Sequence, residues 1–103
     1  MSEPRISIVI PTQRRPGGLA VAMRSALAQT GFEAGALELV VVDNDVLPSA
    51  QAQVEARAAE APFPVTYLHE PRAGVANARN AALGVARAPL IAFLDDDEEA
   101  PAG

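Results

Sequence analysis

The sequence contains no cysteine, and all eight of its basic side chains are arginines, so it also contains no lysine. Without cysteine the chain has no disulfide, no thiolate nucleophile and no cysteine-ligated zinc. Without lysine it has neither a P-loop lysine nor a Schiff-base lysine, and a phosphoacceptor receiver domain would need one as well. The single histidine, His69, excludes a histidine-rich metal site, and we expect a structural or surface role for it.

Long apolar runs are missing too. No run approaches the roughly 20 residues that a membrane-spanning helix needs, and the first residues, MSEPR, lack the apolar core of a secretion signal. The net charge of −5 is opposite in sign to the basic face of a nucleic-acid binder. We therefore expect a cytoplasmic protein with no membrane span and no nucleic-acid partner, and a peripheral position at the inner membrane face is compatible with this composition.

Half of the 103 residues are apolar, which is enough for the core of one small domain or of part of a larger one. Four short apolar runs read as strands. They are Ile6–Ile10, Leu37–Val42, Val65–Leu68 and Leu90–Leu94. The first, second and fourth are nearly continuous, which is typical of strands that are covered on both faces.

Three helical patterns separate these runs, at residues 17–30, 48–61 and 74–88. Apolar residues recur on one face of each helix. The faces comprise Leu19, Met23, Ala26 and Leu27 in the first pattern, Ala50, Val54 and Ala58 in the second, and Val75, Ala78, Ala82, Leu83 and Ala86 in the third. Ser49 is a plausible N-cap of the second helix. The alternation predicts a single α/β domain with about four mostly parallel strands and three helices.

All five aspartates follow the ends of predicted strands, two after the second run and three after the fourth. In an open parallel sheet, ligands bind outside the carboxyl ends of the strands. We therefore expect the aspartates to share one rim with Thr12 and Arg14, which follow the first run. Carboxylate oxygens beside arginines suit a phosphorylated ligand that is bridged by Mg²⁺ or Mn²⁺.

Each of these residues also has a plainer interpretation. The acidic triplet Asp95–Asp97 can be a solvated acidic tail, although its position directly after an apolar run argues against this. Asp43 can cap the next helix or order a turn with Asn44. Arg14 can be an ordinary surface arginine, and Arg79 can form a surface salt bridge. The joint arrangement favours a ligand site more strongly than any single member does.

Taken together, the stretches "ISIVIPTQRR", "LELVVVDND" and "ANARNAALGVARAPLIAFLDDD" resemble the nucleotide-sugar-binding half of family 2 glycosyltransferases. The family pattern is a strand that ends in Pro-Thr, an arginine-containing loop, a second strand that ends in aspartate, an Ala-Arg-Asn helix and a strand that enters an acidic triplet. This resemblance implies a Rossmann-like fold of the GT-A type. Gln13 and Arg14 depart from the pattern, because many members have an aromatic residue and Asn or an acid there.

The resemblance also implies roles for individual residues. The expected nucleotide-sugar-binding residues are Pro11 and Thr12 at the base and ribose, Arg14 in the following loop, Asp43 at the base, Arg79 at the base or diphosphate, Asp95 as the first acidic position, and Asp96 at the ribose. Asp97, with Asp96, is the expected ligand of Mn²⁺ or Mg²⁺. The implied donor is a UDP-, GDP- or dTDP-linked sugar, which is transferred to an acceptor hydroxyl with inversion.

The family's acceptor half and its catalytic base would follow the acidic triplet, so we expect residues 1–103 to be a donor-binding portion that is truncated before that half and inactive alone. An apolar sheet edge left open would favour a homo-oligomer. Two other functions remain open. One is a nucleotidyltransferase that makes activated sugars, although only Arg14, Arg15 and two glycines echo its usual basic loop. The other is a non-enzymatic α/β module that binds a cation or a partner.

Overall fold

The computed structural model describes residues 5–13, 16–28, 36–72 and 74–94. Seven elements alternate along the chain: β1 (Ile6–Thr12), α1 (Pro16–Leu27), β2 (Leu37–Asp43), α2 (Gln51–Ala58), β3 (Val65–His69), α3 (Val75–Val85) and β4 (Leu90–Phe93). The predicted α/β class, with four parallel strands and three helices, is confirmed. No helix in the described part of the chain is long and apolar enough to cross a membrane.

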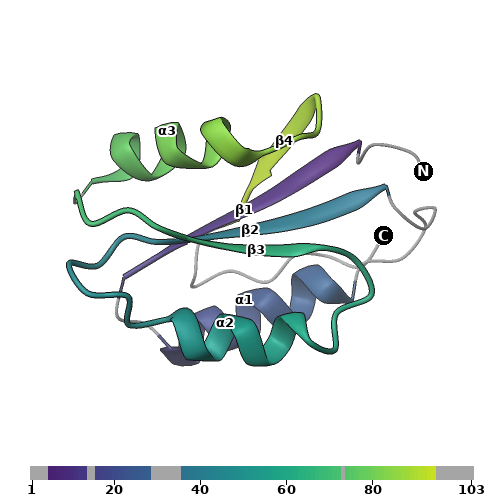
Figure 1. Cartoon of the computed structure of the whole chain (residues 1–103). Coiled ribbons are helices and arrows are strands. Elements are labelled where there is room, and N and C mark those ends of the chain that lie inside the picture. The colour runs from purple at the N-terminus through teal and green to yellow at the C-terminus, as the bar shows by residue number, and fades with distance from the viewer. Residues whose placement is uncertain (1–4, 14–15, 29–35, 73, 95–103) are drawn as a thin grey trace.

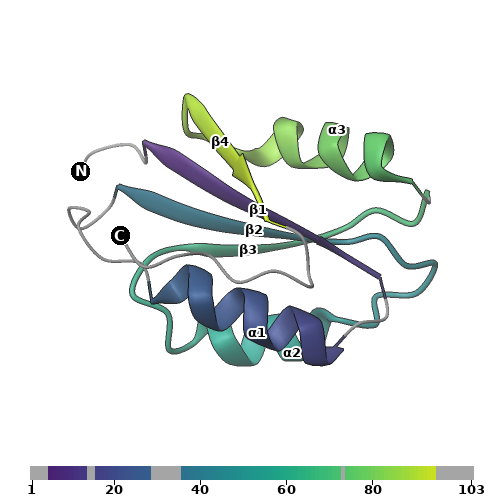
Figure 2. The same cartoon turned by 180° about the vertical axis from the view of Figure 1, so that it is seen from behind.

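The strand order in the sheet is β3-β2-β1-β4. The chain therefore steps outward from β1 through β2 to β3 and then returns across the sheet to place β4 on the free side of β1. Right-handed crossovers in opposite directions put their helices on opposite faces, and α1 and α2 cover one face while α3 covers the other (Figure 1). The reverse view in Figure 2 shows the same three layers. The point of reversal, between β1 and β4, is where such sheets bind ligands.

Alternate residues of the two central strands face the two helical layers. One set packs against α1 and α2, and it includes Ile8, Ile10, Leu39 and Val41 with Leu19, Met23 and Val54. The other set packs under α3, and it consists of Val9, Val40 and Val42 with Ala78 and Ala82. The small alanines of α3 let this helix lie close to the sheet. Since β1 and β2 are buried on both faces, most of their side chains are apolar, as predicted.

The expectation that the fourth run is covered on both faces is wrong. The side chain of Leu90 is 64% exposed and that of Phe93 is 40% exposed. β4 is an edge strand, and the described helices leave much of it open. Leu83 was predicted on the buried face of α3, but it is 54% exposed, because Ala78 and Ala82 make the contact with the sheet.

A polar cluster is buried at the amino-terminal end of the strands, where Ser7 and Glu38 are register partners. The Ser7 hydroxyl donates to the Glu38 carboxylate at 2.5 Å, and the backbone N–H of Arg87 donates to it at 2.7 Å. Burial alone would raise the pKa of Glu38, but these hydrogen bonds and the charge of Arg87 outweigh it and lower the pKa. The cluster fastens the α3–β4 connection to the two central strands.

Candidate functional site

Three strand ends lie side by side at the carboxyl rim of the sheet. Thr12 of β1 is the register partner of Asp43, and Asp43 is in turn the register partner of His69 of β3. The backbone extends this row, because Asn44 N–H donates to Thr12 O at 2.8 Å and Glu70 N–H donates to Asp43 O at 2.9 Å. The prediction that polar residues after separate strands converge at one rim is therefore confirmed for these residues.

Asp43 is fully buried, and both of its carboxylate oxygens accept hydrogen bonds from the chain itself. Oδ2 accepts the backbone N–H of Ala50 and the hydroxyl of Tyr67, both at 2.7 Å. Oδ1 accepts the backbone N–H of Asp45 at the longer distance of 3.3 Å. Asp43 therefore orders the turn after β2 and supports the start of α2, as its plainer interpretation predicted, and Oδ1 is its less engaged oxygen.

The predicted cap of α2 is wrong. The N-cap residue is Ala50 rather than Ser49, and no side chain at the cap position closes the helix. The buried carboxylate of Asp43 takes the Ala50 N–H instead. A buried carboxylate needs donors of its own, and this N–H at the start of a helix is a favourable one.

Tyr67 is a rim residue that the sequence analysis missed. It lies on β3, and its ring packs at the edge of the core under α1 and α2 while its hydroxyl reaches Asp43. Burial, and then the hydrogen bond to the Asp43 carboxylate, raise the pKa of Tyr67. The sequence signal for this contact was the single tyrosine of the chain, which lies in a strand that pairs with the strand ending in Asp43.

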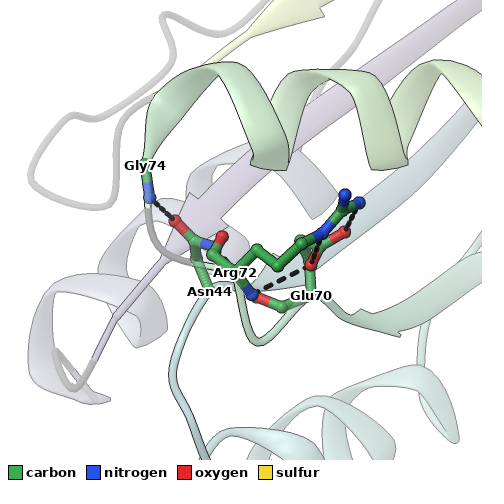
Figure 3. A network of polar contacts seen from close by, with 4 residues as sticks. All are labelled: Asn44, Glu70, Arg72 and Gly74. Carbon is green, nitrogen blue, oxygen red and sulfur yellow. Dashed lines mark hydrogen bonds and ion pairs between the residues drawn. The ribbon is translucent and has the colours of Figure 1, made fainter.

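Asn44 connects the end of β2 to the loop that leads from β3 into α3 (Figure 3). Its side-chain amide donates to the carbonyl oxygens of Glu70 at 2.9 Å and Arg72 at 2.8 Å. Its Oδ1 accepts the backbone N–H of Gly74 at 3.1 Å. Asn44 is only 7% exposed, so these bonds satisfy a buried amide.

Glu70 and Arg72 form a closed ion pair in the same loop (Figure 3). Arg72 Nε donates to Glu70 Oε2 at 3.0 Å and Arg72 Nη2 donates to Oε1 at 2.8 Å, while the Arg72 backbone N–H also reaches Oε2. The guanidinium lowers the pKa of Glu70 to about 2, and the carboxylate raises the pKa of Arg72. A Glu-x-Arg spacing after a strand was the sequence signal for this pair.

The expected structural role of His69 agrees with its geometry. The ring is half-buried, and Nε2 lies 2.9 Å from the carbonyl oxygen of Asp45. Asp45 is itself buried, and its Oδ1 accepts the backbone N–H of Val46 at 2.8 Å. His69 and Asp45 thus brace the loop that follows β2.

Arg79 lies on α3 with its guanidinium carbon 4.8 Å from the centre of the Phe93 ring, which is on β4. This is a cation–π contact, and no carboxylate in the described part of the chain pairs with Arg79. The surface salt bridge that we considered for Arg79 is therefore not found there. The contact sets the predicted arginine beside the strand that leads to Asp95.

The predicted residues Arg14, Asp95, Asp96 and Asp97 lie outside the described residues. The described chain ends at Leu94, whose backbone N–H donates to Val9 O of β1 at 2.9 Å. Pro11 is half-buried and Thr12 is buried at the end of β1. Across the described ranges, no three His, Asp or Glu side chains form a group that could hold a metal ion, so the predicted metal site remains a prediction on the acidic triplet.

Comparisons with known proteins add a family and a fold. A family model described as glycosyl transferase family 2 matches residues 7–103. The succinoglycan biosynthesis protein ExoM of Rhizobium meliloti (strain 1021) is 43% identical over 93 residues, which make up 90% of this chain and 30% of that protein. The chain thus spans less than a third of that curated relative.

Two solved structures have the same arrangement of elements. The mannosyltransferase PcManGT from Pyrobaculum calidifontis, in complex with GDP-Man and Mn²⁺, superimposes with a TM-score of 0.79 at 27% identity, over 98% of this chain and 30% of that one. S. aureus TarS 1-349 in complex with UDP-GlcNAc gives a TM-score of 0.73 at 22% identity, over 92% of this chain and 27% of that one. The second likeness concerns the fold alone.

Proposed function

Because the chain belongs to glycosyl transferase family 2, we propose that it is the donor-binding portion of a glycosyltransferase that uses a nucleoside-diphosphate sugar. The donor binds at the carboxyl rim of the sheet, and its sugar goes to an acceptor hydroxyl with inversion. The observation that carries this proposal is the side-by-side placement of Thr12 and Asp43 at the carboxyl ends of β1 and β2. On the other side of β1, the hydrogen bond from Leu94 N–H to Val9 O joins the end of β4 to this strand. The row ends at Thr12 on β1, one of the two strands that flank the topological reversal, where a nucleotide is expected.

The described residues would hold the nucleoside part of the donor. Pro11 and Thr12 border the base and ribose at the end of β1. We assign a base N–H to Oδ1 of Asp43, because Ala50 and Tyr67 already occupy Oδ2. Because Asp43 is buried, this contact requires the residues around it to leave a path from the base of the donor to Oδ1.

The acidic triplet would hold the diphosphate part. Asp96 and Asp97 offer hard carboxylate oxygens, which suit Mn²⁺ or Mg²⁺, and a relative of known structure contains Mn²⁺ together with GDP-Man. When bound, the cation stabilises the negative charge that develops on the departing nucleoside diphosphate. Arg79, held over Phe93, adds a positive charge beside the strand that leads to the triplet, and Arg14 is proposed as a second.

Calorimetric titration tests this function. The chain is titrated with UDP, GDP and dTDP in the presence of Mn²⁺, of Mg²⁺ and of a chelator. We expect one nucleotide to bind more tightly than the others, with at least about tenfold weaker binding in the chelator. Equal, metal-independent responses to all three nucleotides would contradict the proposal and favour a module that binds a cation or a partner. A parallel titration with UTP, GTP and dTTP that shows clearly tighter binding than the diphosphates would instead favour a nucleotidyltransferase.

A further inference from the structure

Asn44 satisfies every hydrogen-bonding group of its side chain in one loop. Two N–H donors of the amide reach the carbonyl oxygens of Glu70 and Arg72, and Oδ1 accepts the N–H of Gly74. These partners fix the orientation of the amide, because two carbonyls need donors and one N–H needs an acceptor. Among side chains of this size, asparagine is the one that offers two N–H donors and a carbonyl acceptor. Aspartate has the same shape, but its carboxylate would face two carbonyl oxygens.

The contacts of Asn44 form a continuous path from the end of β1 to helix α3. The backbone N–H of Asn44 donates to Thr12 O, and its side chain holds Gly74. Gly74 is the N-cap residue of α3 with a φ of 120°, which favours glycine. Its carbonyl accepts the N–H of Ala78 at 3.1 Å, and Ala78 is buried against the sheet one residue before Arg79.

From this path we propose that Asn44 is a positioning residue of the donor site: it holds the β3–α3 loop, and through it Arg79, in a fixed place relative to Thr12 and Asp43. The inference rests on the proposed function, since it concerns the same rim. Among the described side chains, that of Asn44 joins the end of β2 to this loop by three hydrogen bonds. The ion pair between Glu70 and Arg72 lies within the loop and does not anchor it to β2.

The diagnostic variant is Asn44→Asp, which keeps the shape and replaces two donors by a carboxylate. The matched control is Gln51→Glu, which makes the same amide-to-carboxylate change on an exposed side chain of α2 whose amide contacts Glu55. The first readout is the backbone order of Arg72 and Gly74 from ¹⁵N relaxation at pH 7. We expect both residues to lose order in Asn44→Asp and to keep it in Gln51→Glu.

The pH dependence separates positioning by the amide from a general loss of packing. In Asn44→Asp, the two carbonyl oxygens disfavour the charged form of the introduced carboxyl and so raise its pKa above the ordinary value. As the pH falls through that pKa, the carboxyl becomes protonated and donates one hydrogen bond. The order of the loop should therefore recover in part at low pH. If it stays equally low at every pH, or never falls, the anchoring role is wrong.

The second readout is the affinity for the preferred nucleoside diphosphate with Mn²⁺ at pH 7. We expect binding by Asn44→Asp to be about tenfold weaker or more, and binding by Gln51→Glu to change less than about twofold. A loop that loses order while affinity stays unchanged would overturn the positioning role and leave the proposed function standing. A wild-type chain that binds no nucleotide would remove both. If Asn44→Asp does not fold, Asn44→Ser takes its place in both readouts, since it lacks the amide donors without adding a charge.

Discussion

The hydroxyl of Tyr67 on β3 donates a hydrogen bond to Oδ2 of Asp43 on β2 at 2.7 Å. The bond joins an edge strand of the sheet to the carboxylate that we assign to the base of the donor. It shares Oδ2 with the N–H of Ala50, so two donors hold this oxygen while Oδ1 is held by one long contact. The orientation of Asp43 therefore depends on Tyr67.

We predict that Tyr67→Phe lowers the free energy of unfolding by about 1.5 kcal/mol, because a buried carboxylate loses a donor. Urea unfolding measures this change. Thr66→Val, which removes a hydroxyl from the exposed neighbour on β3, is the control and should change it by less than about 0.5 kcal/mol. Equal effects of the two substitutions would contradict the role assigned to the Tyr67 hydroxyl.

The raised pKa of Tyr67 gives a second prediction, on alkaline stability. A group whose pKa is higher in the folded than in the unfolded chain stabilises the fold fully below the unfolded value, which is 10.0 here, and less as the pH rises above it. Tyr67 is the only tyrosine, so its absorbance near 295 nm follows one group. We expect ionisation to begin above pH 10 and to accompany unfolding. Reversible ionisation near pH 10 in the folded chain would show that the pKa is not raised.

The ion pair of Glu70 and Arg72 predicts an unusually acidic carboxyl. The pKa of Glu70 is lowered to about 2 from 4.5, so its stabilising effect is present above pH 4.5 and is lost as the pH falls toward 2. NMR titration of the Glu70 side chain should show this low pKa in the wild-type chain and a return toward 4.5 in Arg72→Ala. Arg57→Ala is the control and should leave Glu70 unchanged. A Glu70 pKa near 4.5 in the wild type would contradict the paired geometry.

At the opposite end of the sheet, Glu38→Ala should lower the free energy of unfolding by about 2 kcal/mol. The substitution removes the carboxylate that accepts hydrogen bonds from the Ser7 hydroxyl and the Arg87 backbone N–H, and it leaves a buried space in its place. We expect less than the cost of breaking a fully buried pair, because the Arg87 side chain is 54% exposed. Glu60→Ala, on an exposed residue, is the control in urea unfolding. A loss no larger than that of the control would mean that the cluster does not fasten the α3–β4 connection.

The open edge at β4 predicts self-association of the chain. Leu90 exposes an apolar side chain on an edge strand, which is a template for pairing with a second copy. Sedimentation velocity should show a concentration-dependent dimer that Leu90→Arg weakens by about tenfold or more. Leu47→Arg is a matched control, because Leu47 is 65% and Leu90 64% exposed but Leu47 lies in a loop. A monomer at every concentration, or an equal effect of both substitutions, would contradict pairing through β4.

The class of the fold could be predicted because its signals are local. Continuous apolar runs at β1 and β2, and helical spacing between them, needed no knowledge of tertiary contacts. The exposure of β4 could not be read in this way, since an apolar run of five residues looks the same at an edge and in the centre of a sheet. Leu83 was misplaced for a similar reason, because the periodicity of α3 does not say which part of its apolar face meets the sheet.

The rim was predictable in outline but not in detail. Parallel strands bring their carboxyl ends together, so the meeting of Thr12 and Asp43 followed from topology. Tyr67 and Asn44 were missed as partners, because their bonds depend on register between β2 and β3 and on the path of the β3–α3 loop. The cap of α2 was misassigned to Ser49, since Asp43 lies seven positions before Ala50 and the choice between the two residues depends on the path of the loop between them.

The central claim is that the acidic triplet holds a cation together with the donor's diphosphate. The most direct measurement is Mn²⁺ binding by electron paramagnetic resonance, in the presence of the preferred nucleoside diphosphate, for the wild type, Asp97→Asn and Glu99→Gln. We predict that Mn²⁺ affinity falls by at least about tenfold in Asp97→Asn and changes less than about twofold in Glu99→Gln. The same Mn²⁺ affinity in all three proteins would contradict the claim.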